Sequence, residues 1–348
     1  MIKVHYFNSS QVEIAKQWNQ FIHNHPSSHC YHLVEWKSII DQAFRLKGYY
    51  LYATKNSGEI CGICPLILSK SLLFGTYITS IPFFNYSGIL ATDPNVEIVL
   101  LQEAEKIARQ LKASYIEFRH RQALNLDLPT RSHKVRMILK LPVKDPEILW
   151  KGFKAKLRSQ IKRAQRESMT VKFGGIELVP SFYEVFSANM RDLGTPVWTM
   201  EIFRQIASRF SDGSTVCIVE LDGRPIAAAF LIGYKDLIEI PSASSLREFN
   251  RLSPNMLLYW SVLEYACLQG YRYFDFGRSS PGTGTYKFKE QWGADPEPLH
   301  WQYWLNKGHS LPNLNPNNPK YTLMIKTWQK LPLRLSRTIG PLISRHLP

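Results

Sequence analysis

The sequence has few cysteines and lacks a long apolar run. Its 348 residues include five cysteines, an odd number that argues against a disulfide framework. No stretch approaches the roughly 18 uncharged apolar residues that a membrane-spanning helix needs. Residues 1–20 contain no continuous apolar core of the kind found in a secretory signal. We therefore expect a cytoplasmic protein.

Motifs for metal binding and for covalent catalysis are also missing. Cys61 and Cys64 form a CxxC pair inside a strand-like run, where their odd spacing would point the two side chains to opposite faces. Four histidines between residues 23 and 32 surround Pro26 but have no carboxylate beside them. No Ser-His-Asp or Cys-His order is legible. We predict no metal, no bound cofactor and no acyl-enzyme.

Acidic residues are scarce in two segments, and these segments account for most of the net charge of +15. Residues 150–172 hold eight lysines and arginines against one glutamate, and residues 320–348 hold six against no acid. Two basic patches on a nearly neutral remainder predict polyanionic partners. Phosphates, anionic lipid headgroups and RNA fit this pattern.

The two halves of the chain repeat one pattern of predicted elements. Each half reads as two strands around a tight turn, then a helix, then a strand. In the first half the turn is at 56–58, the helix at 96–113 and the strand at 115–120; in the second they fall at 222–223, 254–270 and 271–278. Such a duplication predicts an α/β fold with mixed sheets and two similar domains.

Proline and asparagine mark the predicted domain boundaries. We place an N-terminal domain at 1–144 and a C-terminal domain at 145–305, the latter opening with a basic helix at 147–168. A Pro- and Asn-rich linker follows at 306–320, and a basic amphipathic tail at 321–348. Trp328 and the basic residues of the tail favour a membrane-surface anchor. The alternative is a tail that packs on the second domain.

The predicted basic helix has an apolar stripe and a charged ridge. The stripe consists of Phe153, Leu157, Ile161 and Ala164. The ridge, with one basic residue every four positions, consists of Lys154, Arg158, Lys162 and Arg166. Like charges at this spacing repel, so a bound anion would relieve the repulsion. The alternative is a solvated face without a ligand.

A glycine-rich turn near the end of the second half gathers several charged residues. The strand beginning at Tyr273 carries Asp275 and Arg278, and the SSPGTG run at 279–284 then forces a loop. A short helix follows whose lysines can point back over the strand end. Such strand ends often carry the chemistry of α/β proteins, although a solvated loop with scattered charges is the alternative.

The run FDFGRSSPGTGTYKFKEQWG at 274–293 resembles the signature of the Fem-type peptidyltransferases. It is still more similar to their relatives in exopolysaccharide and exosortase (PEP-CTERM) gene clusters of Gram-negative bacteria. The similarity continues through YHLVEWKSII, KLRSQIKRAQRES, RDLGTPVW and SASSLREFNRLSPNMLLYWSVLEYACLQGYRYFDFGRS, and covers roughly residues 30 to 305. It implies two tandem GNAT-like domains and the transfer of an aminoacyl group to an amine.

The resemblance also implies roles for particular residues. Phe288 and Lys289 match a Phe-Lys pair beside the acyl-transfer point, where Asp275 and Arg278 would join them as catalytic residues. Lys37, with Trp36 before it, matches a substrate-phosphate contact. The remaining candidates for substrate contact are Arg191, Tyr286 and Asn85, and those for tRNA or phosphate contact are Arg158, Lys162, Arg166 and Arg247. The family pattern around Arg191 is closer to R-D-G-F than to the RDLG found here.

The donor is suggested by a missing loop. Acetyl-CoA enzymes of the GNAT type cradle pyrophosphate with a glycine-rich loop, whereas this chain reads SLREFNRLSPNML at 245–257, without glycine. Ser253 and Pro254 suit the start of a helix there. We favour a charged tRNA as donor and a lipid-linked or nucleotide-linked envelope precursor as acceptor at the inner membrane surface, with no role for DNA. The alternatives are an acyl-CoA or acyl-carrier-protein N-acyltransferase and a non-catalytic binding pair.

Overall fold

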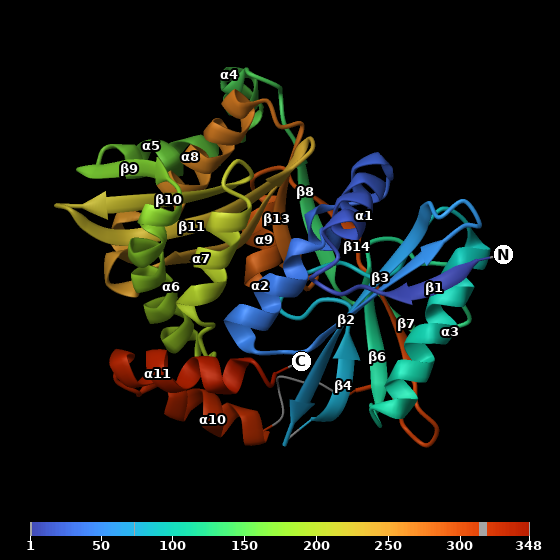
Figure 1. Cartoon of the computed structure of the whole chain (residues 1–348). Helices are drawn as coiled ribbons and strands as arrows, with labels where there is room; N and C mark the ends of the chain where they lie inside the picture. The colour runs from blue at the N-terminus through green and yellow to red at the C-terminus, as the bar shows by residue number, and fades with distance from the viewer. Residues whose placement is uncertain (1, 73, 313–318, 348) are drawn as a thin grey trace. The chain divides into compact units, whose positions relative to one another are not determined.

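The computed structural model describes residues 2–72, 74–312 and 319–347, and it divides into two compact units. Unit 1 comprises 1–134, 298–314 and 345–348, and unit 2 comprises 135–297 and 315–344. Each unit has a mixed sheet flanked by helices (Figure 1). The mixed α/β fold with two similar units predicted from the sequence is confirmed.

Unit 1 is built on one mixed sheet. Its strand order is β1-β2-β3-β4-β6-β15-β7, with β5 paired to β3. The strands are β1 (Lys3–Tyr6), β2 (Gly48–Thr54), β3 (Ile60–Ser71), β4 (Gly75–Thr79), β5 (Leu90–Ala91), β6 (Tyr115–His120), β7 (Thr130–Arg131) and β15 (His300–Leu305). The helices are α1 (Val12–Asn24), η1 (Cys30–His32), α2 (Glu35–Phe44) and α3 (Pro94–Gln110).

Unit 2 has a sheet of the same kind. The order is β14-β8-β13-β12-β11-β10-β9. The strands are β8 (Val135–Lys140), β9 (Met169–Gly174), β10 (Ser214–Leu221), β11 (Arg224–Tyr234), β12 (Leu237–Ser245), β13 (Tyr273–Ser279) and β14 (Asp295–Pro298). The helices are α4 (Pro146–Gly152), α5 (Ala155–Gln165), η2 (Ile176–Leu178), α6 (Val179–Leu193), α7 (Met200–Arg209), η3 (Arg247–Leu252), α8 (Pro254–Gln269), α9 (Gly284–Glu290), α10 (Pro319–Gln329) and α11 (Leu333–Ser344).

The duplication is visible in the register of the two sheets. In unit 1, β4 and β6 are parallel, and α3 lies between them in the chain. In unit 2, β12 and β13 are parallel, and α8 lies between them. The last paired positions are Thr79 with Glu117 and Glu239 with Asp275. Each unit therefore places a carboxylate on its later strand at the point where the parallel strands stop pairing.

The unit boundaries differ from the predicted division at residue 144. Strand β8 precedes that position but pairs with β13 of unit 2, and β15 follows residues 135–297 of unit 2 in the chain but pairs with β6 of unit 1. Pro142 and Pro146 mark only the end of a strand and the start of α4. A local punctuation signal cannot report pairing with a strand more than a hundred residues away, and the compact units divide after Lys134 instead.

The predicted single helix at 147–168 is wrong, because residues 153–154 interrupt it and separate α4 from α5. Phe153 takes an extended backbone, with ψ 144°, and its ring packs edge-on against Trp260 and Trp292. Tertiary packing of one aromatic side chain thus overrides local helix propensity. The predicted apolar stripe is confirmed, since all four of its members are buried.

All five cysteines are buried, and none of them forms a disulfide. Cys61 and Cys64 belong to one hydrophobic cluster, which contradicts the prediction that they face opposite ways. The reason is a register shift opposite Ala53 and Thr54, which interrupts the alternation of β3. Among the described residues, no group of three or more His, Cys, Asp and Glu side chains is arranged to hold a metal ion.

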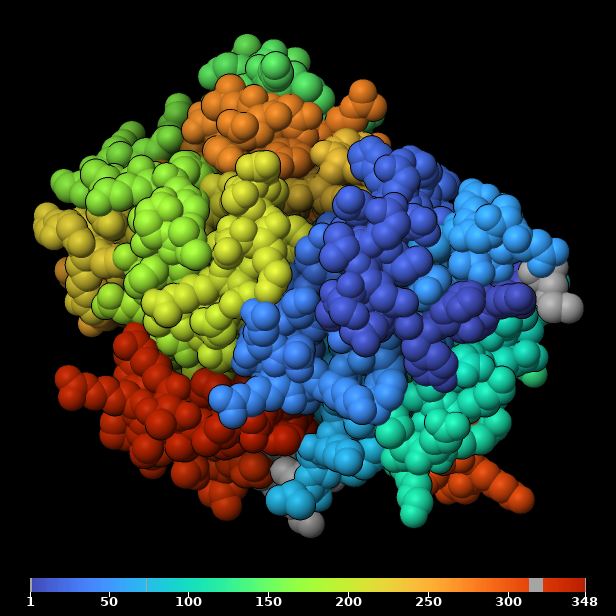
Figure 2. All heavy atoms as spheres, viewed as in Figure 1, coloured from blue at the N-terminus to red at the C-terminus, as the bar shows by residue number. Residues whose placement is uncertain are grey.

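The C-terminal helices α10 and α11 pack on α6 (Figure 1). Figure 2 shows them in red as part of the surface of unit 2. Trp328 is 9% exposed, and a Cβ added at Gly340 would lie 2.8 Å from Val197 Cγ1. This is the packed tail that the sequence left as an alternative. Residues 313–318 of the predicted linker lie outside the described residues, and no described helix is long and apolar enough to cross a bilayer.

Candidate functional site

The candidate site in unit 2 lies where β12 and β13 stop pairing. Beyond Glu239 and Asp275 the two strands separate, while β13 continues to pair with β8. A register shift between Asp275 and Arg278 forms a bulge, and Gly277 within it has φ +74°. A glycine is favoured at this positive φ because it has no Cβ. The bulge turns backbone carbonyls of β13 toward the helix that follows.

Asp275 is the buried acid of this site, with an exposed fraction of 0%. The backbone N–H of Gly277 donates to its Oδ1 at 2.7 Å, and Arg136 Nη1 lies 3.5 Å from its Oδ2. Arg136 is itself buried, and its Nε donates to Glu297 Oε2 at 2.9 Å. Sequence reasoning missed Arg136, although a charged residue inside the apolar strand VRMILK was a usable signal.

Lys289 reaches the bulge from α9, whose first turn is capped by Thr283. Its Nζ donates to the carbonyl oxygens of Gly277 and Arg278, at 3.0 and 2.9 Å. Burial lowers the pKa of Lys289 to about 8, although the carboxylates of Asp275 and Glu239 act to raise it. Lys289 is only 8% exposed, a degree of burial that its position in the run TYKFKEQWG does not predict.

The neighbours of Lys289 differ in burial. Lys287 is exposed, because residues two positions apart on a helix face different ways. Phe288 is half-buried, and its ring packs edge-on against Tyr259 at 4.9 Å between centroids. Tyr286 is half-buried, and the side chain of Arg278 is exposed. The structure therefore brings Asp275, Lys289 and the backbone of Arg278 together, with Phe288 on the core side of α9.

Unit 1 places a different polar group at the equivalent position. Glu117 of β6 accepts a hydrogen bond from Arg119 Nε at 2.6 Å and one from Tyr303 Oη at 2.7 Å. Arg119 also donates to the carbonyl oxygen of Phe84 and is 4% exposed. No lysine matches Lys289 in these contacts. The two units thus share a fold but differ in the chemistry at the end of their parallel strands.

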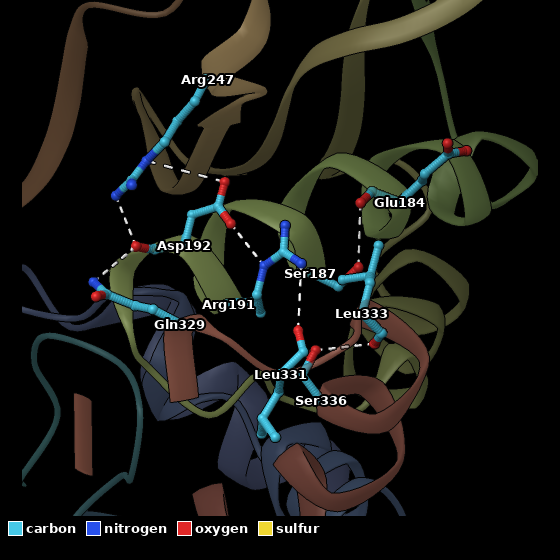
Figure 3. A network of polar contacts seen from close by, with 9 residues as sticks. All are labelled: Glu184, Ser187, Arg191, Asp192, Arg247, Gln329, Leu331, Leu333 and Ser336. Atoms are coloured by element: carbon cyan, nitrogen blue, oxygen red, sulfur yellow. Dashed lines mark hydrogen bonds and ion pairs between the residues drawn. The ribbon is translucent and has the colours of Figure 1, made fainter. Parts of the chain in front are cut away.

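Arg191 lies at the C-terminal end of α6, in the polar network of Figure 3. Its Nε donates to Asp192 Oδ1 at 2.7 Å, and its Nη1 to the Leu331 carbonyl at 3.4 Å. Gln329 Nε2 donates to the backbone carbonyl of Asp192 at 3.0 Å. Arg191, a predicted substrate contact, is therefore ion-paired with the adjacent Asp192 and hydrogen-bonded to the backbone between α10 and α11.

Arg247 approaches the same acid from the other side. Its Nη2 donates to the Asp192 carbonyl at 2.7 Å, and its Nε lies 4.0 Å from Asp192 Oδ2 (Figure 3). The helix after it begins at Pro254 as predicted, but Ser253 makes no side-chain cap. Ser253 instead has φ +57°, in the left-handed region. The predicted capping role of its hydroxyl is thus wrong.

The unit 1 candidates occupy α2 and the loop after β4. Trp36 is fully buried, and its Nε1 donates to the Cys30 carbonyl at 2.8 Å. The side chain is thus part of the core and offers no surface to a ligand, which corrects the prediction of substrate contact. Lys37 is half-buried, with Nζ 3.4 Å from Ser9 Oγ. Asn85 is also half-buried.

The basic ridge remains largely at the surface. Lys162 and Arg166 are exposed, and Arg158 is half-buried with Nη1 3.4 Å from the Lys151 carbonyl. Lys154 precedes α5 as its N-cap residue, so the ridge starts outside the helix. The ammonium of Lys162 lies 6.0 Å from the Trp150 ring centroid. These cations have no carboxylate partner among the ion pairs of the described residues.

Comparison with known families places Asp275 and Lys289 of this site inside a recognised domain. Residues 151–290 match the model of the acetyltransferase (GNAT) domain, and such a domain indicates transferase activity. The match includes β13 and α9 but not Arg136, which lies before its first residue. Curated proteins include no match to the sequence.

Three solved structures are similar to the chain over most of its length. The crystal structure of FemX has a TM-score of 0.66 at 15% identity, covering 93% of this chain and 100% of that one. A tandem GNAT protein from the clavulanic acid biosynthesis pathway has a TM-score of 0.57 at 13% identity, covering 90% and 100%. L-PGS from Bacillus licheniformis has a TM-score of 0.53 at 13% identity, covering 90% and 96%. At these identities the likenesses show the fold, which is that of tandem GNAT domains.

Proposed function

We propose that the chain is an aminoacyltransferase that forms an amide on an amine of a cell-envelope or exopolysaccharide precursor. The observation that carries this proposal is Lys289, a buried ammonium held at the end of the parallel strands within the GNAT domain. A lysine ammonium has three N–H donors. Two of them are taken by the Gly277 and Arg278 carbonyls. We assign the third N–H group to a hydrogen bond with the reacting carbonyl oxygen.

The proposed reaction is direct acyl transfer. The acceptor amine attacks the carbonyl carbon of an aminoacyl ester, and the carbonyl oxygen gains negative charge as the tetrahedral intermediate forms. Lys289 would donate a hydrogen bond to that oxygen. Collapse of the intermediate breaks the ester bond. The proton lost by the amine ends on the ribose oxygen of the aminoacyl ester, which leaves as a hydroxyl. The enzyme contributes mainly position and charge stabilisation.

A charged tRNA is the donor that we favour. The segment η3 before α8 has no glycine between residues 246 and 253, so it lacks the glycine-rich cradle that GNAT enzymes use for the pyrophosphate of CoA. The exposed Lys162 and Arg166 of α5 supply positive charge suited to a polynucleotide backbone. An acyl-CoA or acyl-carrier-protein donor is the alternative, favoured by the GNAT domain match itself.

The donor is tested with the purified full-length protein. We expect product of the mass of an amide when charged tRNAs and an amine-bearing precursor pool are supplied, and weak or absent CoA binding in calorimetry. Micromolar CoA affinity, with turnover of labelled acyl-CoA, would instead establish the alternative. A folded protein that transfers from none of these donors would support a non-catalytic binding pair.

We further propose that the acceptor is reached at the inner membrane surface. The outward side of α11 exposes Leu335, Leu342 and Ile343, and the nearby Lys330 and Arg334 are exposed as well. Apolar side chains beside cations suit an anionic bilayer interface. Membrane binding therefore does not require the tail to leave α6. The inward residues of the tail pack against α6, while the outward residues remain available to contact a bilayer.

Charge reversal should weaken binding to anionic liposomes without removing the packed helices. Each basic residue near such a surface contributes about 1 kcal/mol. The double variant Lys330→Glu/Arg334→Glu should therefore bind at least about 30-fold more weakly in co-sedimentation. A matched reversal of exposed cations elsewhere in unit 2, Arg204→Glu/Lys235→Glu, is the control. Equal losses of liposome binding in both double variants would show that net charge alone drives the binding. No loss in either variant would rule out α11 and its neighbouring cations as the membrane-binding surface.

A further inference from the structure

Unit 1 contains a cavity of about 230 Å³ that none of the roles above uses. It lies beside the end of β6 and the loop that leads into β5, and its wall includes His32 and Ser87. Every residue of its wall belongs to unit 1. We call it the His32–Ser87 cavity.

Two side chains of this wall are buried without a hydrogen-bond partner. His32 is 3% exposed, and neither Nδ1 nor Nε2 of its ring has a partner. Ser87 is 2% exposed, and its Oγ has none. Buried polar groups are nearly always paired, since an unpaired group loses its hydration without compensation. Three unpaired polar atoms on the wall of one cavity indicate that its contents supply the missing partners.

The ring of His120 on the same wall is fully engaged. Its Nε2 accepts from the backbone N–H of Ile89 at 3.0 Å, so its Nδ1 carries the proton and donates to Gln302 Oε1 at 2.9 Å. Gln302 Oε1 also accepts from the Leu124 backbone, which fixes the amide. These bonds engage both ring nitrogens of His120, so the unpaired atoms of His32 and Ser87 are the ones that we assign to a ligand.

The cavity has no excess of charge with which to hold an ion. Burial lowers the pKa of His32 to about 3, with smaller contributions in the same direction from His120, His25 and Arg121. Burial likewise lowers the pKa of His120 to about 4. Both rings are therefore neutral near pH 7. The charged residues of the wall are Glu97 and Arg121, one of each sign.

We propose that the His32–Ser87 cavity binds a neutral, polyhydroxylated molecule of monosaccharide size. A neutral imidazole offers one donor and one acceptor, and a serine hydroxyl offers both. Ligand hydroxyls both donate and accept, so they match either tautomer of His32 together with Ser87. The volume is below the roughly 300–1,000 Å³ of pockets for drug-sized ligands. It suits a single sugar ring better than a nucleotide.

The inference concerns unit 1 alone and does not depend on the transfer reaction, so binding is measured without any acyl donor. The probes are D-glucose, D-galactose, N-acetyl-D-glucosamine and glycerol, observed by saturation-transfer NMR with the full-length protein. Glycine serves as a zwitterionic probe of similar polarity. We expect at least one sugar to give saturable binding in the millimolar range or tighter.

Variants of Ser87 locate the binding. Ser87→Ala removes only the unpaired hydroxyl and keeps the backbone N–H that donates to the Arg119 carbonyl, so the fold should persist. Ser87→Val also fills part of the cavity. We expect sugar binding at least about 10-fold weaker in Ser87→Ala and undetectable in Ser87→Val. Ser214→Ala is the matched control, since Ser214 is a buried serine of unit 2 whose Oγ also has no partner.

The outcomes separate clearly. Sugar binding that both Ser87 variants weaken and Ser214→Ala preserves would support the proposal. Binding that is unchanged in both Ser87 variants would place the ligand elsewhere and overturn it. Absence of saturable sugar or glycerol binding to wild type would show that the cavity holds only water. Saturable glycine binding without sugar binding would overturn the ligand class.

Discussion

Replacing Lys289 with methionine should lower turnover by about 100-fold or more, the loss associated with one hydrogen-bond donor to a developing oxyanion. Methionine keeps the unbranched shape and most of the length of the side chain, and it removes the donors. The measurement is kcat and kcat/KM with the donor that supports turnover in wild type. A donor used only in the transition state lowers both by the same factor.

The pH profile separates a charge-stabilising role from a structural one. The pKa of Lys289 lies near 8, because burial disfavours its ammonium form. If the ammonium stabilises the transition state, wild-type kcat/KM should lose this contribution as pH rises through about 8. The residual activity of Lys289→Met should lack that alkaline loss. If Lys289 instead acted as a base, its contribution would increase over the same range.

The unfolding free energy should also fall in Lys289→Met, whereas replacing an exposed lysine would leave it nearly unchanged. The variant leaves the carbonyls of Gly277 and Arg278 without their donor, which costs about 1–3 kcal/mol of unfolding free energy at pH 7. In wild type the linkage has a definite sign. Since the folded pKa is below the usual 10.5, the unfolded chain binds more protons between pH 8 and 10.5, and stability gains from this group as pH rises through that window.

Lys287→Met is the matched control for this prediction. It removes the same charge from the same helix at an exposed position. It should keep turnover within about twofold and change stability by less than about 0.5 kcal/mol. Full turnover in both variants would refute the assignment of Lys289. Equal losses in both would indicate a general effect of charge on α9.

Arg136→Met should lower the unfolding free energy by about 3–5 kcal/mol, the largest stability effect that we expect from a single substitution here. Removing one partner of a buried ion pair leaves the other charge in a low-dielectric environment without compensation. Asp275 is that partner, with its Oδ2 3.5 Å from Arg136 Nη1 and an exposed fraction of 0%. Urea unfolding, with comparison of the m-values, gives the measurement.

The other acid bonded to Arg136 provides the control. Glu297 accepts from the same guanidinium, but its side chain is 50% exposed. Glu297→Gln should therefore cost less than about 1 kcal/mol, because exposed ion pairs contribute little. If the two substitutions cost the same, the buried pair with Asp275 would have no special weight, and the bulge at Gly277 would owe its stability to other contacts.

Local signals in the sequence predicted the individual elements well. The strand predicted at 115–120 is β6 with the same bounds, and the helix predicted at 254–270 is α8 with its end one residue earlier. The turn at Asp222 has a positive φ at both Asp222 and Gly223, as a tight hairpin turn requires. Hydrophobic periodicity and turn residues act over a few neighbours, so a single sequence displays them directly.

Burial of individual polar groups was much harder to predict. Lys289 and Lys287 look alike in the run TYKFKEQWG, yet one is bonded to the bulge and the other is exposed. The sequence predicts a substrate contact for Arg191 but gives no sign of the Leu331 carbonyl to which Arg191 donates, about 140 residues later in the chain. Such pairings depend on which segments meet in space, and sequence spacing carries no record of them.

The sequence by itself determined the duplicated α/β pattern, the basic residues of α5 and α11, and the placement of Lys289 after a glycine-rich turn. The tertiary structure decided that β8 pairs with β13 and β15 with β6. It also decided the burial of Lys289 and Arg136 around Asp275 and the packing of the tail on α6. The physical reason is the range of the interactions. Propensity and periodicity act between neighbours in sequence, whereas strand pairing, desolvation and ion pairing act between residues that only the folded chain brings together.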